Sequence, residues 1–333
     1  MFENEAAVGT ADVLDADSFY VPAFDVSISR DRGTQVIARD GVMDGFAGEM
    51  CGAIGSQGSS MAFSCELHPI DTVVDPYFVR LLQGCGWEGT DTGTSIIMYP
   101  SAAPIVGYTA VEPSSLTIGW VHRNDTIPDT LQSMTGSTGA ANFVFNSGKR
   151  AQLDFSFVGL QDQYITTGSF STFGANTFTG VACSPFIVKG VLATMTDAGG
   201  KTIDVVSLAD FSMNTNAQTP DVLDPTSASG FGVSPVLFDS SPTVSFTVAA
   251  TDNNNKVFWQ NFSKGTTIAI SITMTDAATG NSIALNLDQV QSTKLDMSPR
   301  NGLESYSVEG KVVRTPGESY QDPGSFCQFV WTY

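Results

Sequence analysis

Residues 134–160 read MTGSTGAANFVFNSGKRAQLDFSFVGL, and this stretch decides the fold class that the sequence predicts. Apolar and polar side chains alternate along both of its halves, and Asn146, Ser147 and Gly148 lie between them. A period of two is typical of a β-strand with one buried face, and Asn, Ser and Gly favour a tight turn. We therefore expect a β-hairpin, with one alternating set of apolar side chains on each arm: Ala141, Phe143, Phe145, Leu153, Phe155 and Phe157.

Similar alternation recurs along most of the chain and predicts a mainly β protein. Further strands are predicted at residues 24–29, 33–38, 60–67, 96–99, 115–121, 186–196, 202–208, 243–249, 257–262, 266–274, 281–287, 303–313 and 326–332. The polar run 252–256 is expected to be a hairpin turn, although its side-chain oxygens would also suit calcium. Trp120 and Trp259 lie within predicted strands and are expected to pack in the core.

One short helix is predicted, over about residues 75–84. Asp75 can cap its first turn, Pro76 suits the first helical position and Gly84 suits its end. Apolar side chains at helical spacing are expected to pack the helix against the core, namely Phe78, Leu81 and Leu82.

Composition limits the classes of function. The chain has 333 residues, of which 42% are hydrophobic and only 15% are charged, and its net charge is −19. Because acids exceed bases in both halves, the surface repels phosphate backbones, which disfavours tight nucleic-acid binding and leaves only weak contact open. The acidity also fits a role in solubility alone. A low charge content is typical of chains whose outer faces pack on other chains.

The sequence contains no recognisable catalytic constellation. It has two histidines, His68 and His122, and none of its five cysteines form a C-x-x-C pair. The zinc-protease, phosphate-loop, nucleophile-elbow and dinucleotide motifs are all missing. We therefore predict no enzyme activity, no cofactor and no metal. Cys65, Cys85 and Cys183 are expected to be small buried side chains in a reducing compartment, and no apolar run is long enough to span a membrane.

Four segments are predicted along the chain. They are an acidic N-terminal arm at 1–22, a first β-module at 23–165, a polar linker at 166–184 and a second β-module at 185–333. The two modules show weak sequence similarity, since LDFSFVG at 153–159 and ESYSVEG at 304–310 both alternate and both end on glycine. An internal duplication is the interpretation. Within the first module a glycine-rich stretch, 41–60, is predicted to be a long loop, and loops of that length are usually functional or disordered.

Several motifs, in this order, resemble one protein family. They are SCEL at 64–67 followed by PYFVRLLQGCGW at 76–87, YTAVEPSSLTIGW at 108–120, and the stretch 134–160; GTT at 265–267 with TGNSIAL at 279–285 continues the pattern. The chain is similar to the major tail protein, or tail tube protein, of long-tailed, non-contractile bacteriophages (siphophages). The likeness is strongest over residues 60–165. The run HRNDTIP at 122–128 departs from it, because it is longer than a tight hairpin turn.

The resemblance implies two tandem tail-tube-type β-sandwich or barrel modules, one flanking helix and long assembly loops. Subunits of the family form stacked rings around a channel through which the phage genome leaves the capsid. Two modules in one chain imply a trimeric ring that mimics a hexamer, with a true hexamer as the alternative. The implied partners are the chain itself, other tail proteins such as the tape measure and terminator, and phage DNA that passes without specific binding. The implied location is the virion tail, and the host cytoplasm during assembly.

Two sets of residues are candidates for these roles. The candidate channel-lining hairpin comprises Ala141, Phe143, Lys149, Arg150, Asp154 and Ser156. The candidate inter-ring loop comprises Asp44, Gly45, Gly48, Glu49, Gly52, Gly55 and Gly58. The arm 1–22 is a further candidate for contacts between rings, ordered on assembly.

Two other functions fit a β-sandwich of this composition. The main alternative is a surface protein for adhesion or carbohydrate binding. A β-sandwich hydrolase is a third interpretation, which the scarcity of histidine disfavours.

Overall fold

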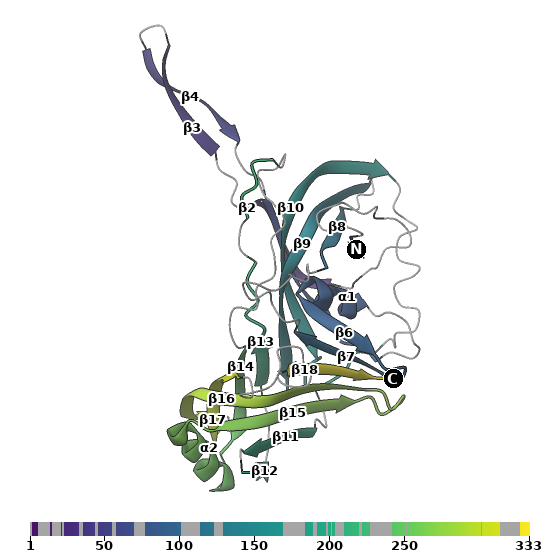
Figure 1. Ribbon diagram of the computed structural model, residues 1–333, viewed down its shortest axis with the longest axis vertical. Coiled ribbons are helices and arrows are strands. Elements are labelled where there is room, and N and C mark those ends of the chain that lie inside the picture. Colours follow the sequence, from purple (N-terminus) through teal and green to yellow (C-terminus); the bar gives the residue numbers. More distant parts are fainter. Residues whose placement is uncertain are drawn as a thin grey trace.

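The structure is a computed structural model. The residues that it describes are 2–5, 14, 21, 23–32, 36–43, 46–54, 58–69, 77–100, 114–122, 129–168, 184–188, 192–197, 199–200, 202–203, 210–219, 222–226, 242–250, 252–300, 302–313 and 327–333. The protein is mainly β, and two short helices lie in this described part (Figure 1).

The strands and helices divide almost evenly between the two halves of the chain. The first half contains β1 (Phe2–Asn4), β2 (Ala23–Arg32), β3 (Val36–Met43), β4 (Phe46–Ile54), β5 (Gly58–Glu66), α1 (Tyr77–Gly84), β6 (Trp87–Asp91), β7 (Ser95–Pro100), β8 (Leu116–His122), β9 (Asp129–Asn146) and β10 (Gln152–Gly168). The second half contains β11 (Leu192–Asp197), β12 (Thr202–Ile203), β13 (Asp210–Asn214), β14 (Thr243–Ala249), α2 (Asp252–Lys264), β15 (Thr267–Thr275), β16 (Ser282–Arg300), β17 (Leu303–Val312) and β18 (Cys327–Thr332).

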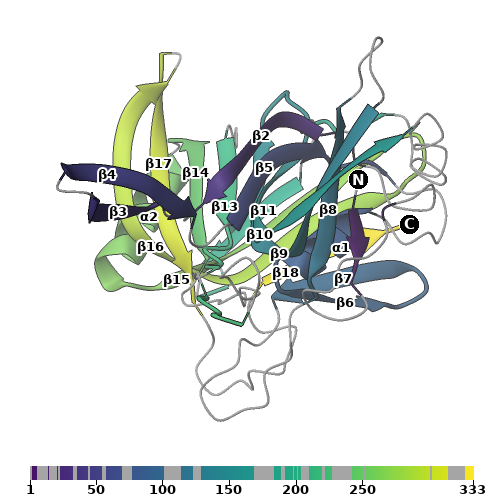
Figure 2. The ribbon, with the colours of Figure 1, turned by 90° about the horizontal axis from the view of Figure 1, so that it is seen from above.

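Sixteen strands of the described chain join into one antiparallel sheet that runs through both halves. Its main path is β12-β11-β15-β16-β17-β14-β13-β9-β10-β5-β2. The halves meet where β13 pairs with β9, and again where β18 pairs with β7. Figure 2 shows β17, β14, β13, β5 and β2 following one another across the molecule. Among the described strands, β3 and β4 alone lie outside this sheet, as a separate two-stranded hairpin.

The two halves have the same strand connectivity. In the first half the pairing order is β2-β5-β10-β9-β8, and α1 follows β5 in the chain. In the second half the order is β13-β14-β17-β16-β15, and α2 follows β14. The first half contains the long strands β9 and β10, of 18 and 17 residues, and the second half contains β16, of 19 residues. The pairings of β9 with β8 and β10, and of β16 with β15 and β17, are each interrupted by a register shift.

The core is one continuous cluster of buried apolar side chains, drawn from both halves. The predicted helix is present as α1, and its expected packing residues Phe78, Leu81 and Leu82 are all buried. The ring of Phe78 stacks on Trp331 of β18 with centroids 3.7 Å apart. Because Trp331 comes from the last strand of the chain, α1 is held by residues of both halves.

The hairpin predicted from residues 134–160 is confirmed as β9 and β10, and its turn contains Gly148 with φ 75°. Both strands are longer than expected, since the pairing extends to Asp129 and Gly168. The first residues of the expected linker 166–184 therefore belong to β10. Residues 169–183 lie outside the described part of the chain.

Several sequence-based expectations about local structure are wrong. The stretch 41–60 is not a long loop, because most of it forms β3, β4 and the start of β5. Residues 252–262 are not a turn and a strand, because they form α2. Val257 and Phe258 are buried on one face of α2, and Gly265 follows its end with φ 64°, as a helix C-terminus favours. Trp259, expected in the core, is 48% exposed on this helix.

Candidate functional site

A polar face extends over seven neighbouring strands, from β16 through β17, β14, β13, β9 and β10 to β5. Directly paired residues of an antiparallel sheet share a face, so the pairing registers define cross-strand rows. One row runs Ser64, Asp154, Asn142, Asn214, Thr243, Lys311; a second runs Glu66, Gln152, Val144, Ser212, Ser245, Glu309, Lys294; a third runs Asn146, Asp210, Thr247, Ser307, Asp296. We call these three rows the polar face.

The opposite face of the same strands is apolar and buried. Its side chains include Phe63, Phe143, Phe155, Phe211, Met213, Phe246, Val248, Tyr306 and Val308. Strict alternation therefore separates the core from a surface that carries mostly hydroxyl, amide and carboxylate groups. Two-faced strands of this kind need a polar environment on one side only.

Side-chain hydrogen bonds connect neighbouring strands of the polar face, both within a row and between rows. Ser64 Oγ donates to Asp154 Oδ1 at 2.6 Å, and Asn142 Nδ2 donates to Asp154 Oδ2 at 3.4 Å. At the other end, Lys294 Nζ lies 3.0 Å from both Asp296 Oδ2 and Glu309 Oε1. These hydrogen bonds, first to Asp296 and then to Glu309, raise the pKa of Lys294. Its charge is thus already matched within the face.

Carboxylates outnumber ammonium groups on the polar face. The acidic members of the three rows are Glu66, Asp154, Asp210, Asp296 and Glu309, and the basic members are Lys294 and Lys311. The remaining members are neutral, and most of them are Ser, Thr, Asn or Gln. Glu66 is buried and pairs with Arg150, so the exposed excess of carboxylates comes from the other four acids. A phosphate backbone close to this face would therefore meet net repulsion and no array of cations.

The structure splits the candidate channel-lining hairpin between two faces. Asp154 and Ser156 lie on the polar side of β10, and Ser156 is exposed. Ala141 and Phe143 are 1% and 0% exposed in the core. The grouping of these residues was therefore wrong, because it combined odd-numbered positions of β9 with the outward positions of β10.

Lys149 and Arg150, the remaining members of that candidate set, lie at the turn between β9 and β10. Arg150 pairs with the carboxylate of buried Glu66, and its guanidinium lies 5.7 Å from the centroid of the Phe24 ring. His68 Nε2 lies 3.6 Å from the other carboxylate oxygen of Glu66. Arg150 thus joins the turn to β5 and to the start of β2.

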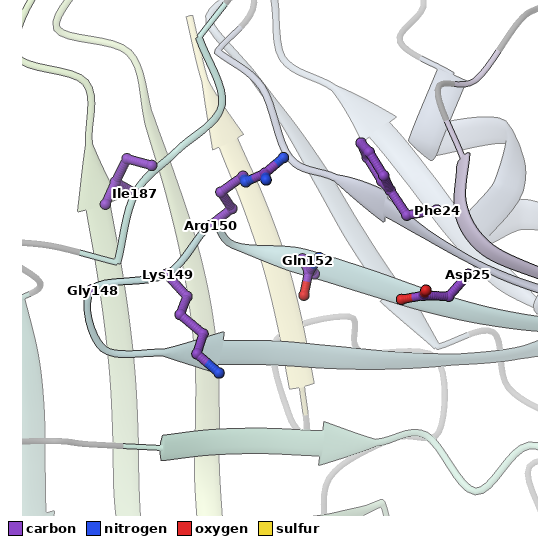
Figure 3. Close-up of a pocket in the computed structure, with 7 residues that line it drawn as sticks. All are labelled: Phe24, Asp25, Gly148, Lys149, Arg150, Gln152 and Ile187. Atoms are coloured by element: carbon purple, nitrogen blue, oxygen red, sulfur yellow. The ribbon is translucent and has the colours of Figure 1, made fainter.

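A pocket of about 540 Å³ lies beside this turn (Figure 3). Its lining comprises Phe24, Asp25, Gly148, Lys149, Arg150, Gln152 and Ile187. Figure 3 shows Arg150 directed toward Phe24, whereas Lys149 extends the other way. Among these lining residues there is no nucleophile beside a general base, which an acyl- or glycosyl-transfer site requires.

The candidate inter-ring residues lie on two different elements. Gly48, Glu49 and Gly52 belong to β4, and Gly58 is the first residue of β5, where it pairs with Arg32 and Leu160. Gly58 is therefore part of the main sheet rather than of a loop. The others in this set, Asp44, Gly45 and Gly55, lie outside the described residues. Figure 1 shows the β3–β4 hairpin standing away from the rest of the molecule.

The beginning of the predicted N-terminal arm is a strand. β1 pairs with β8, with Phe2 opposite Ile118. Just after it, the Glu5 carboxylate accepts hydrogen bonds from Thr117 Oγ1 at 2.9 Å and from the backbone N–H of Gly136 at 2.7 Å. The expectation that the arm becomes ordered only on assembly is therefore wrong for residues 2–5. Of the rest of the arm 1–22, only Leu14 and Val21 are described.

The cysteines that the structure describes in detail are buried thiols. Cys65 and Cys85 are 0% exposed, as expected, and Cys327 is 1% exposed. Burial raises the pKa of all three thiols. Within the described residues, no three metal-ligating side chains cluster, and neither helix has the length and apolar character of a membrane span. Cys183 lies outside this part of the chain.

Comparison with protein-family models found no match, and comparison with curated proteins found none either.

Sequence reasoning missed β13, because residues 209–213 were assigned to no element between the strand predicted at 202–208 and a loop predicted at 214–232. It also missed that β9 is shared between the halves. The alternation Phe211-Ser-Met213 was the available signal for β13, and it is short.

Proposed function

We propose that this chain is the tail tube subunit of a long-tailed, non-contractile phage, and that the polar face lines the channel. The observation that carries the proposal is the wall of eight strands from β16 to β2, which has an apolar core on one side and the polar face on the other. Such a wall suits a conduit, because the surface that meets the cargo is hydrophilic while the core lies behind it. The motifs over residues 60–165 add the family resemblance.

The matching connectivity supports two tandem tail-tube-type modules. Four strands of the wall come from each half, β9-β10-β5-β2 and β16-β17-β14-β13, in the same pairing order. The two glycines that end the similar stretches, Gly159 and Gly310, also occupy similar environments. A Cβ on Gly159 would lie 2.8 Å from the Thr135 carbonyl oxygen, and one on Gly310 would lie 3.0 Å from that of Gln291. Both glycines let the wall strand approach the bulged long strand, β9 or β16.

Two modules per chain favour a trimeric ring that mimics a hexamer. Three copies would give a wall of 24 strands. Barrels of about 16 to 18 strands already enclose an aqueous channel, so this wall would enclose a wider one. Acidic and neutral side chains would let DNA pass without adhering.

The β3–β4 hairpin is the candidate for contacts between stacked rings. Its strands pair only with each other among the described residues, and it stands away from the body (Figure 1). The further partners in this proposal are the tape measure and terminator proteins, and the location is the virion tail.

Electron microscopy of the purified chain tests the proposal. The expected result is rings that stack into hollow tubes at high protein concentration. A monodisperse monomer at the same concentration would contradict it.

The channel lining has its own test. Ser245→Lys places an ammonium group on an exposed position of the polar face, and Ser156→Lys places one on an exposed position of β10 on the same side as Asp154. Tubes that carry both substitutions should retain DNA at low salt and release it as salt rises, because phosphate contacts depend on ionic strength. Wild-type tubes should not retain DNA. Equal retention by both would place these residues outside the channel.

Exposed aromatic side chains on α2 favour a second candidate, a carbohydrate-binding surface protein. Trp259 is 48% and Phe262 is 38% exposed, with ring centroids 6.4 Å apart. Exposed aromatic rings of this kind can stack on apolar sugar faces. Retention of the chain on a glycan column, lost in Trp259→Ala, together with failure to form rings, would favour this candidate.

A further inference from the structure

The two halves of the chain are joined by one strand pairing, and the same kind of pairing could join one chain to the next. β13 of the second half pairs antiparallel with β9 of the first, from Asp210 opposite Asn146 to Asn214 opposite Asn142. This contact, which we call the internal seam, lies on the same side of β9 as β8 and just beyond it. The side chains that meet there are buried, and Phe145 and Phe211 stack at 5.9 Å.

The equivalent of β9 in the second half has a vacant edge at the corresponding place. β15 pairs with β16 as far as Gln291, in the way that β8 pairs with β9. Beyond that point β16 continues to Arg300 and pairs only with β17 on its other side, so no described strand covers residues 292–300 on the β15 side.

The equivalent of β13 in the first half is β2, since each pairs antiparallel with the strand that precedes a helix. β2 pairs with β5 and ends the sheet order, so no described strand pairs with its outer side. Within the described residues, one copy of each half of the internal seam thus has no partner strand, and the two copies lie at opposite ends of the wall.

Large apolar side chains are exposed at both of these ends. Met297 on β16 is 53% exposed, although its paired neighbour Tyr306 is 1% exposed on the same face. At the other end, Val26 of β2 is 47% exposed. At the internal seam, by contrast, Phe143 and Phe145 of β9 and Met213 of β13 are buried. Exposure at these two ends therefore marks where the sheet stops.

We propose that β2 of one copy pairs antiparallel with residues 292–300 of β16 in the next copy, head to tail, and so reproduces the internal seam between chains. The inference rests on the proposed function and names the edges that close its ring. Because the two edges differ, each copy offers one and accepts the other. Such a heterologous contact closes into a ring when the rotation per copy allows.

The vacant edges also carry features that limit indiscriminate pairing. Pro299 offers no backbone N–H on β16. β2 has register shifts near both ends, and Asp25 there has φ 51°. Irregular edges of this kind disfavour random edge-to-edge aggregation, and the matching edge of another copy is the intended partner. The external seam also lacks the stacked aromatic pair, so it should dissociate on dilution while the internal seam holds.

Two single variants test the pairing, one at each edge. Val26→Lys and Met297→Lys each place a charge on an exposed edge residue, so folding should be preserved, as circular dichroism and an unchanged unfolding midpoint would show. Each variant alone should require about tenfold or more higher concentration to form rings in sedimentation velocity, because a charge at the seam weakens the pairing. The matched control is Ala278→Lys in the exposed turn between β15 and β16, which should assemble as the wild type does.

Mixing the two variants distinguishes a head-to-tail seam from a symmetric one. A Val26→Lys chain keeps an intact β16 edge, and a Met297→Lys chain keeps an intact β2 edge. The mixture should therefore form a heterodimer and stop there. Assembly of either variant alone at wild-type concentration, or a mixture that stays monomeric, would overturn the proposal.

The outcomes separate this inference from the proposed function. If wild-type rings form and stack but both edge variants assemble normally, the tail tube proposal stands and the seam is wrong. If the variants behave as described but the rings never stack into hollow tubes, the seam stands and the tube proposal is wrong. A wild-type chain that remains monomeric contradicts both.

Discussion

Replacing Phe211 with alanine should destabilise the whole molecule and not only its second half. Phe211 is 0% exposed in β13, and its ring stacks on Phe145 of β9 across the internal seam. Removing a fully buried phenylalanine side chain costs about 3 to 5 kcal/mol, and the stacked pair adds about 0.5 to 1.5 kcal/mol of coupling. We expect a loss of about 4 kcal/mol in the free energy of unfolding.

Urea unfolding, followed by both tryptophan fluorescence and far-ultraviolet circular dichroism, measures this loss. The continuous sheet and core predict one transition that both probes report, shifted to lower urea in the variant. The double variant Phe145→Ala/Phe211→Ala should cost less than the sum of the single variants, by the coupling between the rings. Phe262→Ala, which removes a 38% exposed ring from α2, is the control and should cost under about 1 kcal/mol.

Two results would refute the reasoning. One is a Phe211→Ala variant that loses less than about 1 kcal/mol, because a ring packed as the structure has it cannot be removed so cheaply. The other is a wild-type protein that unfolds in two separate transitions, with only one affected by the substitution. That pattern would mean that the halves fold independently and that β13 does not bind β9.

Three further predictions concern other parts of the chain. Replacing residues 36–54 by a short Gly-Ser link should leave rings intact and abolish stacking, since β3 and β4 pair only with each other in the described chain; tubes of normal length in electron micrographs would contradict the inter-ring role. Gly139→Ala should cost about 1 to 3 kcal/mol in urea unfolding, because the new Cβ would lie 2.2 Å from the Ser156 carbonyl oxygen, whereas Gly199→Ala should be nearly neutral; equal effects would argue against this packing. In a background with Cys51 and Cys183 replaced by serine, the three buried thiols should resist iodoacetamide until the protein unfolds. Their raised pKa values give stability that is complete below the ordinary thiol pKa of about 8.5 and declines above it, so rapid alkylation of the folded chain at pH 8 would contradict their burial.

The strands were predictable from sequence wherever alternation was strong. Every second residue over 141–145 and 151–157 is apolar, and these residues are buried in the structure. The helix α1 was equally accessible, because a cap, a proline and an apolar stripe agree over residues 75–84. Local signals of this kind depend only on the nearest residues in the chain.

The failures have different physical causes. In α2, Val257, Phe258 and Phe262 fit a strand as readily as a helix over so short a run, and burial against β14 and β17 favours the helix: the Phe258 ring lies 6.3 Å from Phe246 and 5.7 Å from Tyr306. The β3–β4 stretch carries many glycines, which obscure a period of two.

The candidate site could be predicted only in part. Asp154 and Ser156 were correctly expected to share a face, since they are two residues apart in one strand. Ala141 and Phe143 were assigned to that face in error, because the parity of β9 relative to β10 depends on the register of their hairpin. The vacant edges of β2 and β16 could not be read from the sequence at all, because an edge is defined by the absence of a partner strand in three dimensions.

End-on averages of assembled particles in the electron microscope test the central claim most directly. The account predicts hollow rings with threefold symmetry and a weaker sixfold repeat, because each chain contributes two similar groups of four strands to one wall. Closed twofold dimers, rings without a channel, or a chain that remains monomeric at high concentration would contradict it.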